Sequence, residues 1–98
     1  MTVRLTPAAE ADVRAIYAWY QDHGEGVAAD FKQVLDAALA RIGLTPRAYP
    51  QVHGPVRRVV LHRFPYCVFY IPQETEIIVY GVFHGHRDPS VWRRRHDA

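Results

Sequence analysis

The chain has 98 residues, of which 49% are hydrophobic and 22% are charged. This length and composition are those of one small globular domain, spanning residues 1–98, with a modest core. No apolar run approaches the roughly 20 residues that span a bilayer, and the N-terminus lacks the basic and then apolar order of a secretory signal. Cys67 is the single cysteine, which excludes an intramolecular disulfide. We therefore expect a cytoplasmic protein without a membrane segment.

The net charge of +2 is unevenly distributed along the chain. Residues 1–49 hold five bases and six acids, a balance of −1, whereas residues 50–98 hold seven bases and four acids, a balance of +3. All the bases of the second half are arginine, which makes bidentate contacts with carboxylates and phosphates. This half therefore favours an acidic partner, either a nucleic acid or an acidic protein segment.

Two amphipathic helices are predicted in the first half. After a short strand candidate at residues 3–5, Thr6 supplies a hydroxyl N-cap and a proline occupies the first helical position. Apolar side chains then recur at helical spacing until the glycine turn at residues 24–26. A second apolar stripe follows, and Gly43 is a natural stop for it. Two such helices joined by a short turn predict an antiparallel αα-hairpin.

The second half reads as a sheet. Residues 45–55 hold three prolines and are predicted to be a loop. Strand candidates follow at residues 56–62, 66–71 and 76–83, with connections of hairpin length, so we expect an antiparallel meander. The first of these strands carries two adjacent arginines, which favour an exposed sheet edge. The order β-α-α-β-β-β predicts an α+β fold, an antiparallel sheet with the αα-hairpin packed on one face.

Ionisable side chains gather directly after the last predicted strand. The apolar run 77–83 is followed by two histidines, an arginine and an aspartate before Pro89 ends strand pairing. In an extended strand, Tyr80, Val82 and His84 share one face. A rigid strand that delivers such groups to its own end is a common way to build a site. A buried strand must also end in polar residues, so a purely structural interpretation stays open.

Four short motifs stand at defined places among these elements. They are Ala8–Val13 at the start of the first helix, Ile16–Tyr20 within it, Arg63–Tyr66 between two strands, and His84–Pro89 followed by Trp92 and Arg95. Together with the order of elements, they resemble the RelE/ParE toxin superfamily of bacterial type II toxin–antitoxin systems. The last motif is similar to the closing motif of ParE-like members, so the ParE-like branch is favoured.

The resemblance implies a toxin that inhibits growth by poisoning DNA gyrase. It also implies neutralisation by a cognate, ParD-like antitoxin, whose C-terminal segment wraps the toxin in a hetero-oligomer. On this interpretation the chain acts by binding and has no catalytic centre and no cofactor. The candidate contact residues for the target or the antitoxin are Trp19, Arg58, Arg63, Tyr80, His84, His86 and, first among them, Arg87.

Two alternatives stay open. RelE-like members cleave messenger RNA in the ribosome, which requires proton-transfer groups and a cation for the developing phosphorane charge. His84 and His86 are the candidates for proton transfer, which Tyr80 could in principle also perform, and Arg87 is the candidate for the cation. Nuclease relatives usually keep a tyrosine or histidine near the C-terminus as a catalytic group. Here that region offers Trp92, which has no acid–base chemistry, and His96 in an expected frayed tail, and this departure counts against cleavage. The third hypothesis is a basic module without toxicity, either a degenerate toxin or a small repressor subunit.

Structural roles compete with functional ones for several of these residues. A metal on His84-x-His86 would need a further ligand such as His62 or Asp88, and no spacing demands one, so no metal is expected.

The aromatic and basic residues of the C-terminus and the first helix also have structural interpretations. Trp92 is predicted to fold the C-terminal turn onto the sheet, and Arg93–Arg95 to form a solvated tail. Trp19 lies outside the main apolar stripe, which predicts an exposed indole that can join a partner-binding surface.

Overall fold

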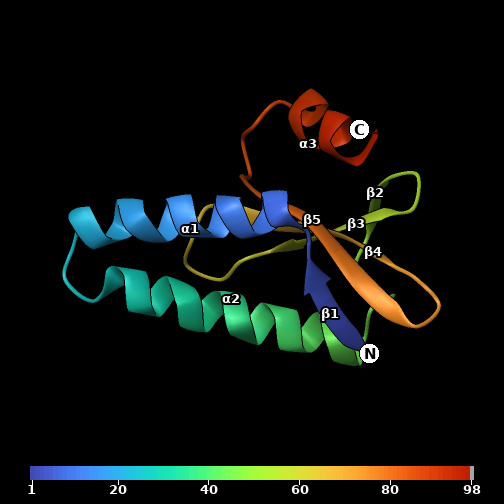
Figure 1. The fold of residues 1–98 in the computed structure, drawn as a ribbon, viewed down its shortest axis with the longest axis horizontal. Coiled ribbons are helices and arrows are strands. Elements are labelled where there is room, and N and C mark those ends of the chain that lie inside the picture. Colours follow the sequence, from blue (N-terminus) through green and yellow to red (C-terminus); the bar gives the residue numbers. More distant parts are fainter. Residues whose placement is uncertain (98) are drawn as a thin grey trace.

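One mixed sheet carries helices on both of its faces. The computed structural model describes residues 1–97. In chain order the elements are β1 (Thr2–Leu5), α1 (Pro7–Asp22), α2 (Val27–Leu44), β2 (Gln51–His53), β3 (Val56–Val60), β4 (Tyr66–Pro72), β5 (Glu76–His84) and α3 (Pro89–Asp97). The strand order is β1-β5-β4-β3-β2. Figure 1 shows α1 and α2 as an antiparallel hairpin, with α3 beyond α1. The predicted α+β fold class is confirmed.

The N-terminal signals of the hairpin act as the sequence predicts. Thr6 is the N-cap of α1, and its hydroxyl oxygen accepts a hydrogen bond from the Ala9 N–H at 3.1 Å. Gly26 precedes α2 in a left-handed conformation with a φ of 78°, which a glycine adopts without steric cost. Within residues 1–97, no helix combines the length and the apolar character needed to cross a membrane.

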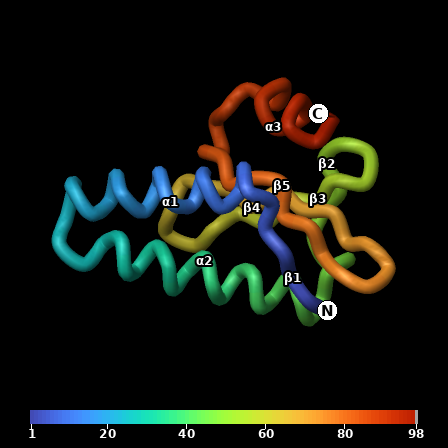
Figure 2. Tube along the Cα trace, in the orientation of Figure 1, coloured from blue at the N-terminus to red at the C-terminus, as the bar shows by residue number. Residues whose placement is uncertain are grey.

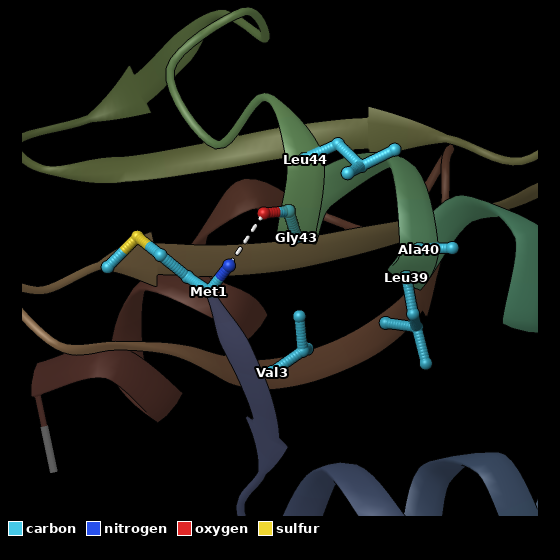
Figure 3. Close-up of a pocket in the computed structure, with 6 residues that line it drawn as sticks. All are labelled: Met1, Val3, Leu39, Ala40, Gly43 and Leu44. Carbon is cyan, nitrogen blue, oxygen red and sulfur yellow. Dashed lines mark hydrogen bonds between the residues drawn. The ribbon is translucent and has the colours of Figure 1, made fainter.

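Gly43 has a different role from the predicted helix stop. The helix α2 continues to Leu44. A Cβ at position 43 would lie 3.2 Å from the carbonyl oxygen of Met1, so the glycine allows β1 to approach the end of α2 closely. The Met1 amino group donates a hydrogen bond to the Gly43 carbonyl at 3.0 Å, as Figure 3 shows. This contact ties the start of β1 to α2.

The strands β3, β4 and β5 form the predicted antiparallel meander. The strand β1 joins β5 in parallel, with Leu5 opposite Val79, so the complete sheet is mixed. The strand β2 lies inside the predicted loop and pairs with β3 across a turn at Gly54. The prediction that β3 is the sheet edge is therefore wrong, since three residues of β2 cover it.

The arginine at the start of β3 is not an exposed edge charge. Arg57 is half-buried, and its Nη1 donates hydrogen bonds to the carbonyl oxygens of Arg47 at 3.1 Å and Tyr49 at 2.6 Å. The Tyr70 hydroxyl donates to the carbonyl oxygen of Pro46 at 2.7 Å. These contacts anchor the proline-rich segment after α2 to the sheet.

Two hydrophobic clusters lie on opposite faces of the sheet. The hairpin-side cluster joins α1 and α2 to one face and includes Phe31 and Val79. The α3-side cluster lies on the other face, where Trp92 stacks on Phe69 with ring centroids 4.8 Å apart. Trp92 is 7% exposed, so its predicted packing on the sheet is confirmed. The C-terminal segment is a nine-residue helix, where a turn and a solvated tail were predicted.

The helix α3 begins with a side-chain cap. The Asp88 carboxylate accepts a hydrogen bond from the Ser90 N–H at 2.9 Å. Hydrogen bonds from the backbone and side chain of Ser90 hold the pKa of Asp88 below its ordinary value. Because that pKa is lowered by folding, the cap stabilises α3 at neutral pH, and its contribution is lost as the pH falls through the lowered pKa.

A β-bulge at Tyr80 reverses the predicted facing of β5. Phe69 pairs with Gly81 and Tyr70 pairs with Val79, so Tyr80 is the extra residue. Tyr80 packs against the α3-side cluster, whereas Val82 belongs to the hairpin-side cluster. The prediction that Tyr80 and Val82 share one face is therefore wrong, since the bulge shifts the alternation by one residue.

We predict that Gly81→Ala destabilises the fold by about 1–3 kcal/mol, because a Cβ at position 81 would overlap the buried Phe83 ring. Urea unfolding followed by circular dichroism measures this loss. The matched control is Gly85→Ala, whose Cβ would meet Cys67 Sγ at an ordinary 3.5 Å. Equal stabilities of the two variants would contradict the account of the bulge.

Candidate binding groove beside β5

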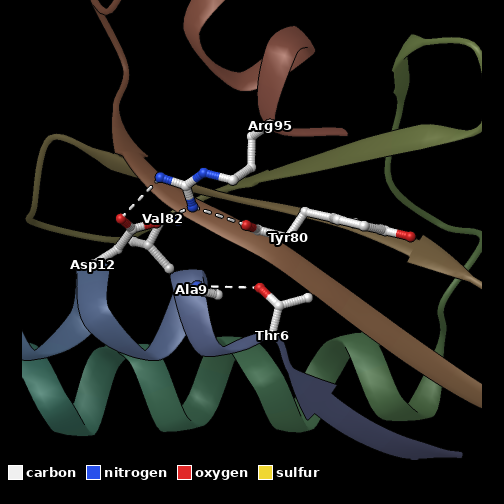
Figure 4. A network of polar contacts seen from close by, with 6 residues as sticks. All are labelled: Thr6, Ala9, Asp12, Tyr80, Val82 and Arg95. Carbon is white, nitrogen blue, oxygen red and sulfur yellow. Dashed lines mark hydrogen bonds and ion pairs between the residues drawn. The ribbon is translucent and has the colours of Figure 1, made fainter. Parts of the chain in front are cut away.

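An ion pair replaces a missing strand at the edge of β5. The strand β1 accompanies β5 only as far as Val79. Past that point, Asp12 Oδ2 accepts a hydrogen bond from the Val82 N–H at 3.0 Å, and Arg95 Nη1 donates one to the Tyr80 carbonyl oxygen at 3.1 Å. Arg95 also binds both Asp12 oxygens, at 3.0 and 3.2 Å (Figure 4). We refer to Asp12 and Arg95 as the β5 clamp.

The β5 clamp is largely withdrawn from solvent. The side chains of Arg95 and Asp12 are 27% and 17% exposed, and the Arg95 guanidinium lies 4.7 Å from the centre of the Phe83 ring. Screening by water is weaker here than for an exposed pair, and the bidentate geometry is favourable. The prediction of a solvated tail is therefore wrong for Arg95, whereas Arg93 and Arg94 are exposed as predicted.

A groove of about 400 Å³ lies above the clamp, between α1 and the end of β5. We refer to it as the α1–β5 groove. It brings together Trp19, His84 and Arg87, three of the residues predicted from the sequence to contact a partner. The other polar and aromatic residues that line it are Asp12, Tyr66, Phe83 and Arg95.

Trp19 forms an ordered aromatic wall of the groove. Its side chain is 53% exposed, which confirms the predicted exposure. The His23 ring stacks on the indole with centroids 3.8 Å apart and planes 5° apart. His23 Nδ1 lies 2.7 Å from the Trp19 carbonyl oxygen, so this nitrogen carries the proton and donates. The stack holds the exposed indole of Trp19 in place, one helical turn after Ala15, which also lines the groove.

His84 and Arg87 form the polar end of the groove. His84 Nδ1 accepts a hydrogen bond from the His86 N–H at 3.1 Å, so the neutral imidazole carries its proton on Nε2. The Arg87 N–H donates to the His84 carbonyl oxygen at 3.0 Å. Arg87 is exposed and makes no ion pair within residues 1–97. The groove therefore presents a cation free to bind an acidic group, with a histidine N–H beside it.

The other four predicted contact residues lie elsewhere. Arg58 and His86 line a separate hollow of about 290 Å³ beside Cys67. Burial raises the pKa of the Cys67 thiol, which disfavours the nucleophilic thiolate. Arg63 pairs with Asp30 on α2 at 3.5 Å.

Tyr80 is withdrawn from both hollows. It lies under α3, where its ring meets the ring of His96 with centroids 5.6 Å apart. The predicted set of seven residues is thus divided among separate surfaces and does not form one site.

Sequence reasoning missed Asp12, although a signal was present. Ala9 and Ile16 are the buried residues of α1, and position 12 lies on the same helical stripe between them. A carboxylate at a core-facing position needs a partner that compensates its charge. That partner, Arg95, is one of three consecutive arginines, so the sequence did not indicate which of them would bind Asp12.

The architecture agrees with a solved toxin–antitoxin structure. A chain of the structure described as "Chromosomal ParDE TA system from P. aeruginosa" aligns with a TM-score of 0.68 and 22% identity, over 86% of this chain and 95% of that chain. This similarity establishes the class of fold. The family model described as "ParE toxin of type II toxin-antitoxin system, parDE" matches residues 3–89. The chain belongs to this ParE toxin family. No curated protein matches it significantly.

We predict that Asp12→Ala lowers the free energy of unfolding by about 2–4 kcal/mol, because it leaves the Val82 N–H and the Arg95 guanidinium without their shared acceptor. Chemical denaturation measures the loss. Arg94→Ala, on the exposed side of α3, is the matched control and is expected to change stability by less than about 0.5 kcal/mol. If a double-mutant cycle of Asp12 and Arg95 gave no coupling, the clamp would have no energetic role.

Proposed function

We propose that this chain inhibits growth by binding DNA gyrase, without a catalytic centre of its own, and that a cognate antitoxin neutralises it. On this proposal residues 1–98 act as a single toxin domain in the cytoplasm. Membership of the ParE toxin family supports the role as a toxin. The observation that carries the proposal further is the exposed, unpaired Arg87 at the polar end of the α1–β5 groove.

The α1–β5 groove suits a protein surface with an acidic side chain. The stacked indole of Trp19 offers apolar area that costs little conformational entropy on binding, because His23 already fixes it. Arg87 offers bidentate hydrogen bonds to a carboxylate, and aromatic and arginine residues are the usual anchors of protein interfaces. The β5 clamp holds the strand that ends at His84 and leads into the turn with Arg87.

A second groove lies between α1 and α2, and we propose that it binds a helix of the antitoxin. We refer to it as the α1–α2 groove. It measures about 430 Å³ and is lined by apolar side chains that include Tyr17, Phe31 and Leu35, with Arg14 and Lys32 also lining it. An amphipathic helix of the antitoxin would place its apolar face here. Leu39 lines both this groove and the hollow beside Met1 in Figure 3, so the apolar surface continues towards β1.

Ribosome-dependent cleavage of messenger RNA is the alternative, and one observation favours it. His84 and Tyr66 lie side by side, with ring centroids 5.6 Å apart, in the same groove as Arg87. Such groups could move protons while the guanidinium neutralises a phosphorane. His86 and Tyr80, the other proton-transfer candidates, do not line this groove. A nuclease would therefore have to use His84, with Tyr66 beside it, for proton transfer.

We predict that Arg87→Ala abolishes growth arrest in induced bacteria, because it removes the only arginine of the described chain that lines this groove without an ion pair. Its circular dichroism and thermal unfolding are expected to stay unchanged, since Arg87 is exposed. Arg94→Ala is the control and should arrest growth as the unchanged chain does. A folded Arg87→Ala protein that still arrests growth would overturn the assignment.

The same induced cells distinguish the two targets. Binding to gyrase predicts filamentation, DNA damage and intact transcripts, together with inhibition of gyrase supercoiling by the purified chain. New cleavage sites inside translated regions, lost on His84→Ala, would establish the nuclease alternative instead. Expression of a folded chain without arrest would favour a basic module that has no toxicity.

We predict that Ala18→Glu prevents neutralisation by the co-expressed antitoxin but leaves growth arrest intact, because Ala18 is exposed and lines the α1–α2 groove. Ala11→Glu is the matched control, since Ala11 is exposed on the same helix and lines neither groove. Co-purification and a growth assay measure both outcomes. Full rescue of the Ala18→Glu variant would place the antitoxin helix elsewhere.

A further inference from the structure

Three metal-ligating side chains meet where the end of α3 reaches the turn between β2 and β3. They are His53, His96 and Asp97, and one ligand atom of each lies within 4.8 Å of the other two. His96 Nδ1 lies 3.1 Å from Asp97 Oδ1. Both histidines are half-buried, and Asp97 is exposed. Segments far apart in the sequence therefore converge on one small volume.

The two imidazole rings are held in place by aromatic neighbours. His53 meets the edge of Trp92, with ring centroids 6.0 Å apart, and Trp92 is itself buried. His96 meets Tyr80 with centroids 5.6 Å apart. The centroids of the two imidazoles are 6.1 Å apart. The rings are thus oriented by packing before any ion binds, which lowers the entropic cost of binding one.

The geometry points to a binding site for a divalent transition metal of the zinc class, with His53, His96 and Asp97 as its ligands. Zinc binds imidazole nitrogen and carboxylate oxygen at about 2.0–2.2 Å, which separates tetrahedral ligand atoms by about 3.4 Å. The present separations need to close by about 1.4 Å at most, which rotation of the exposed Asp97 side chain and small adjustments of the two rings can supply. Two imidazoles favour zinc, nickel or copper over magnesium and calcium. Water completes the coordination on the exposed side of Asp97.

The sequence-based candidate His84-x-His86 is a poorer site. It belongs to no group of three ligands among the described residues. His84 also uses its Nδ1 as the acceptor of the His86 N–H.

A bound ion would fasten α3 to the β2–β3 turn. The helix α3 supplies Arg95 to the β5 clamp, one residue before His96. An ion that binds only the docked helix stabilises that state by mass action. Metal binding therefore protects the clamp, and with it the end of β5 at His84 and the turn after it that carries Arg87.

The test is a zinc titration of the 98-residue chain after removal of metals with a chelator. We expect one zinc ion per chain and a rise in Tm of roughly 10 °C at a free zinc concentration about 100 times the Kd. In the unchanged chain, nuclear magnetic resonance should show the His53 and His96 ring signals shifting with added zinc. Amide exchange in α3 should slow at the same time. Absence of these changes overturns the proposal.

Variants then identify the ligands. His53→Gln and His96→Gln keep polar side chains and should each remove the zinc-dependent rise in Tm. The double variant His84→Gln/His86→Gln is the control and should retain it. An undiminished rise in the His53→Gln protein, or its loss in the double variant, would refute the assignment. Because no readout depends on growth arrest, the result is independent of the proposed function.

Discussion

The β5 clamp is the interaction on which the rest of the structure depends. A strand edge that loses its neighbour leaves N–H and C=O groups that must find other partners. Here the Asp12 carboxylate takes the place of a strand acceptor and the Arg95 guanidinium that of a donor. Because the two side chains also bind each other, one ion pair joins α1, β5 and α3. The walls of the α1–β5 groove are thereby fixed relative to one another.

The bulge at Tyr80 decides which side chains reach that groove. Without the extra residue, the strict alternation of β5 would place Tyr80 on the same face as Val82. Val79 belongs to the hairpin-side cluster, so Tyr80 faces α3, and the bulge then returns Val82 and His84 to the side of α1. The bulge also requires a glycine at position 81, because the Phe83 ring occupies the space that a side chain at that position would need. Arg95 then lies over that ring.

The hairpin and the meander could be predicted from the sequence because strong local signals define them. Thr6 caps α1, glycines bound the turn after it, and long apolar stretches mark β4 and β5. The elements that were missed depend on tertiary contacts. The strand β2 has three residues, and α3 buries only Trp92 among its described side chains, so neither shows a periodic apolar pattern. The bulge likewise follows from pairing and not from composition.

The helix α1 separates the two grooves, and this has a consequence for the neutralisation that we propose. Figure 2 shows α1 lying between α2 and α3, and it lines both the α1–α2 groove and the α1–β5 groove. An antitoxin helix seated between α1 and α2 would not touch Arg87. Neutralisation would then require either steric exclusion of a large target or a second, acidic antitoxin segment that crosses α1 to reach Arg87. The exposed stack of Trp19 on His23 lies at the α1 wall of the α1–β5 groove. An antitoxin segment that covered this stack would therefore also block the α1–β5 groove.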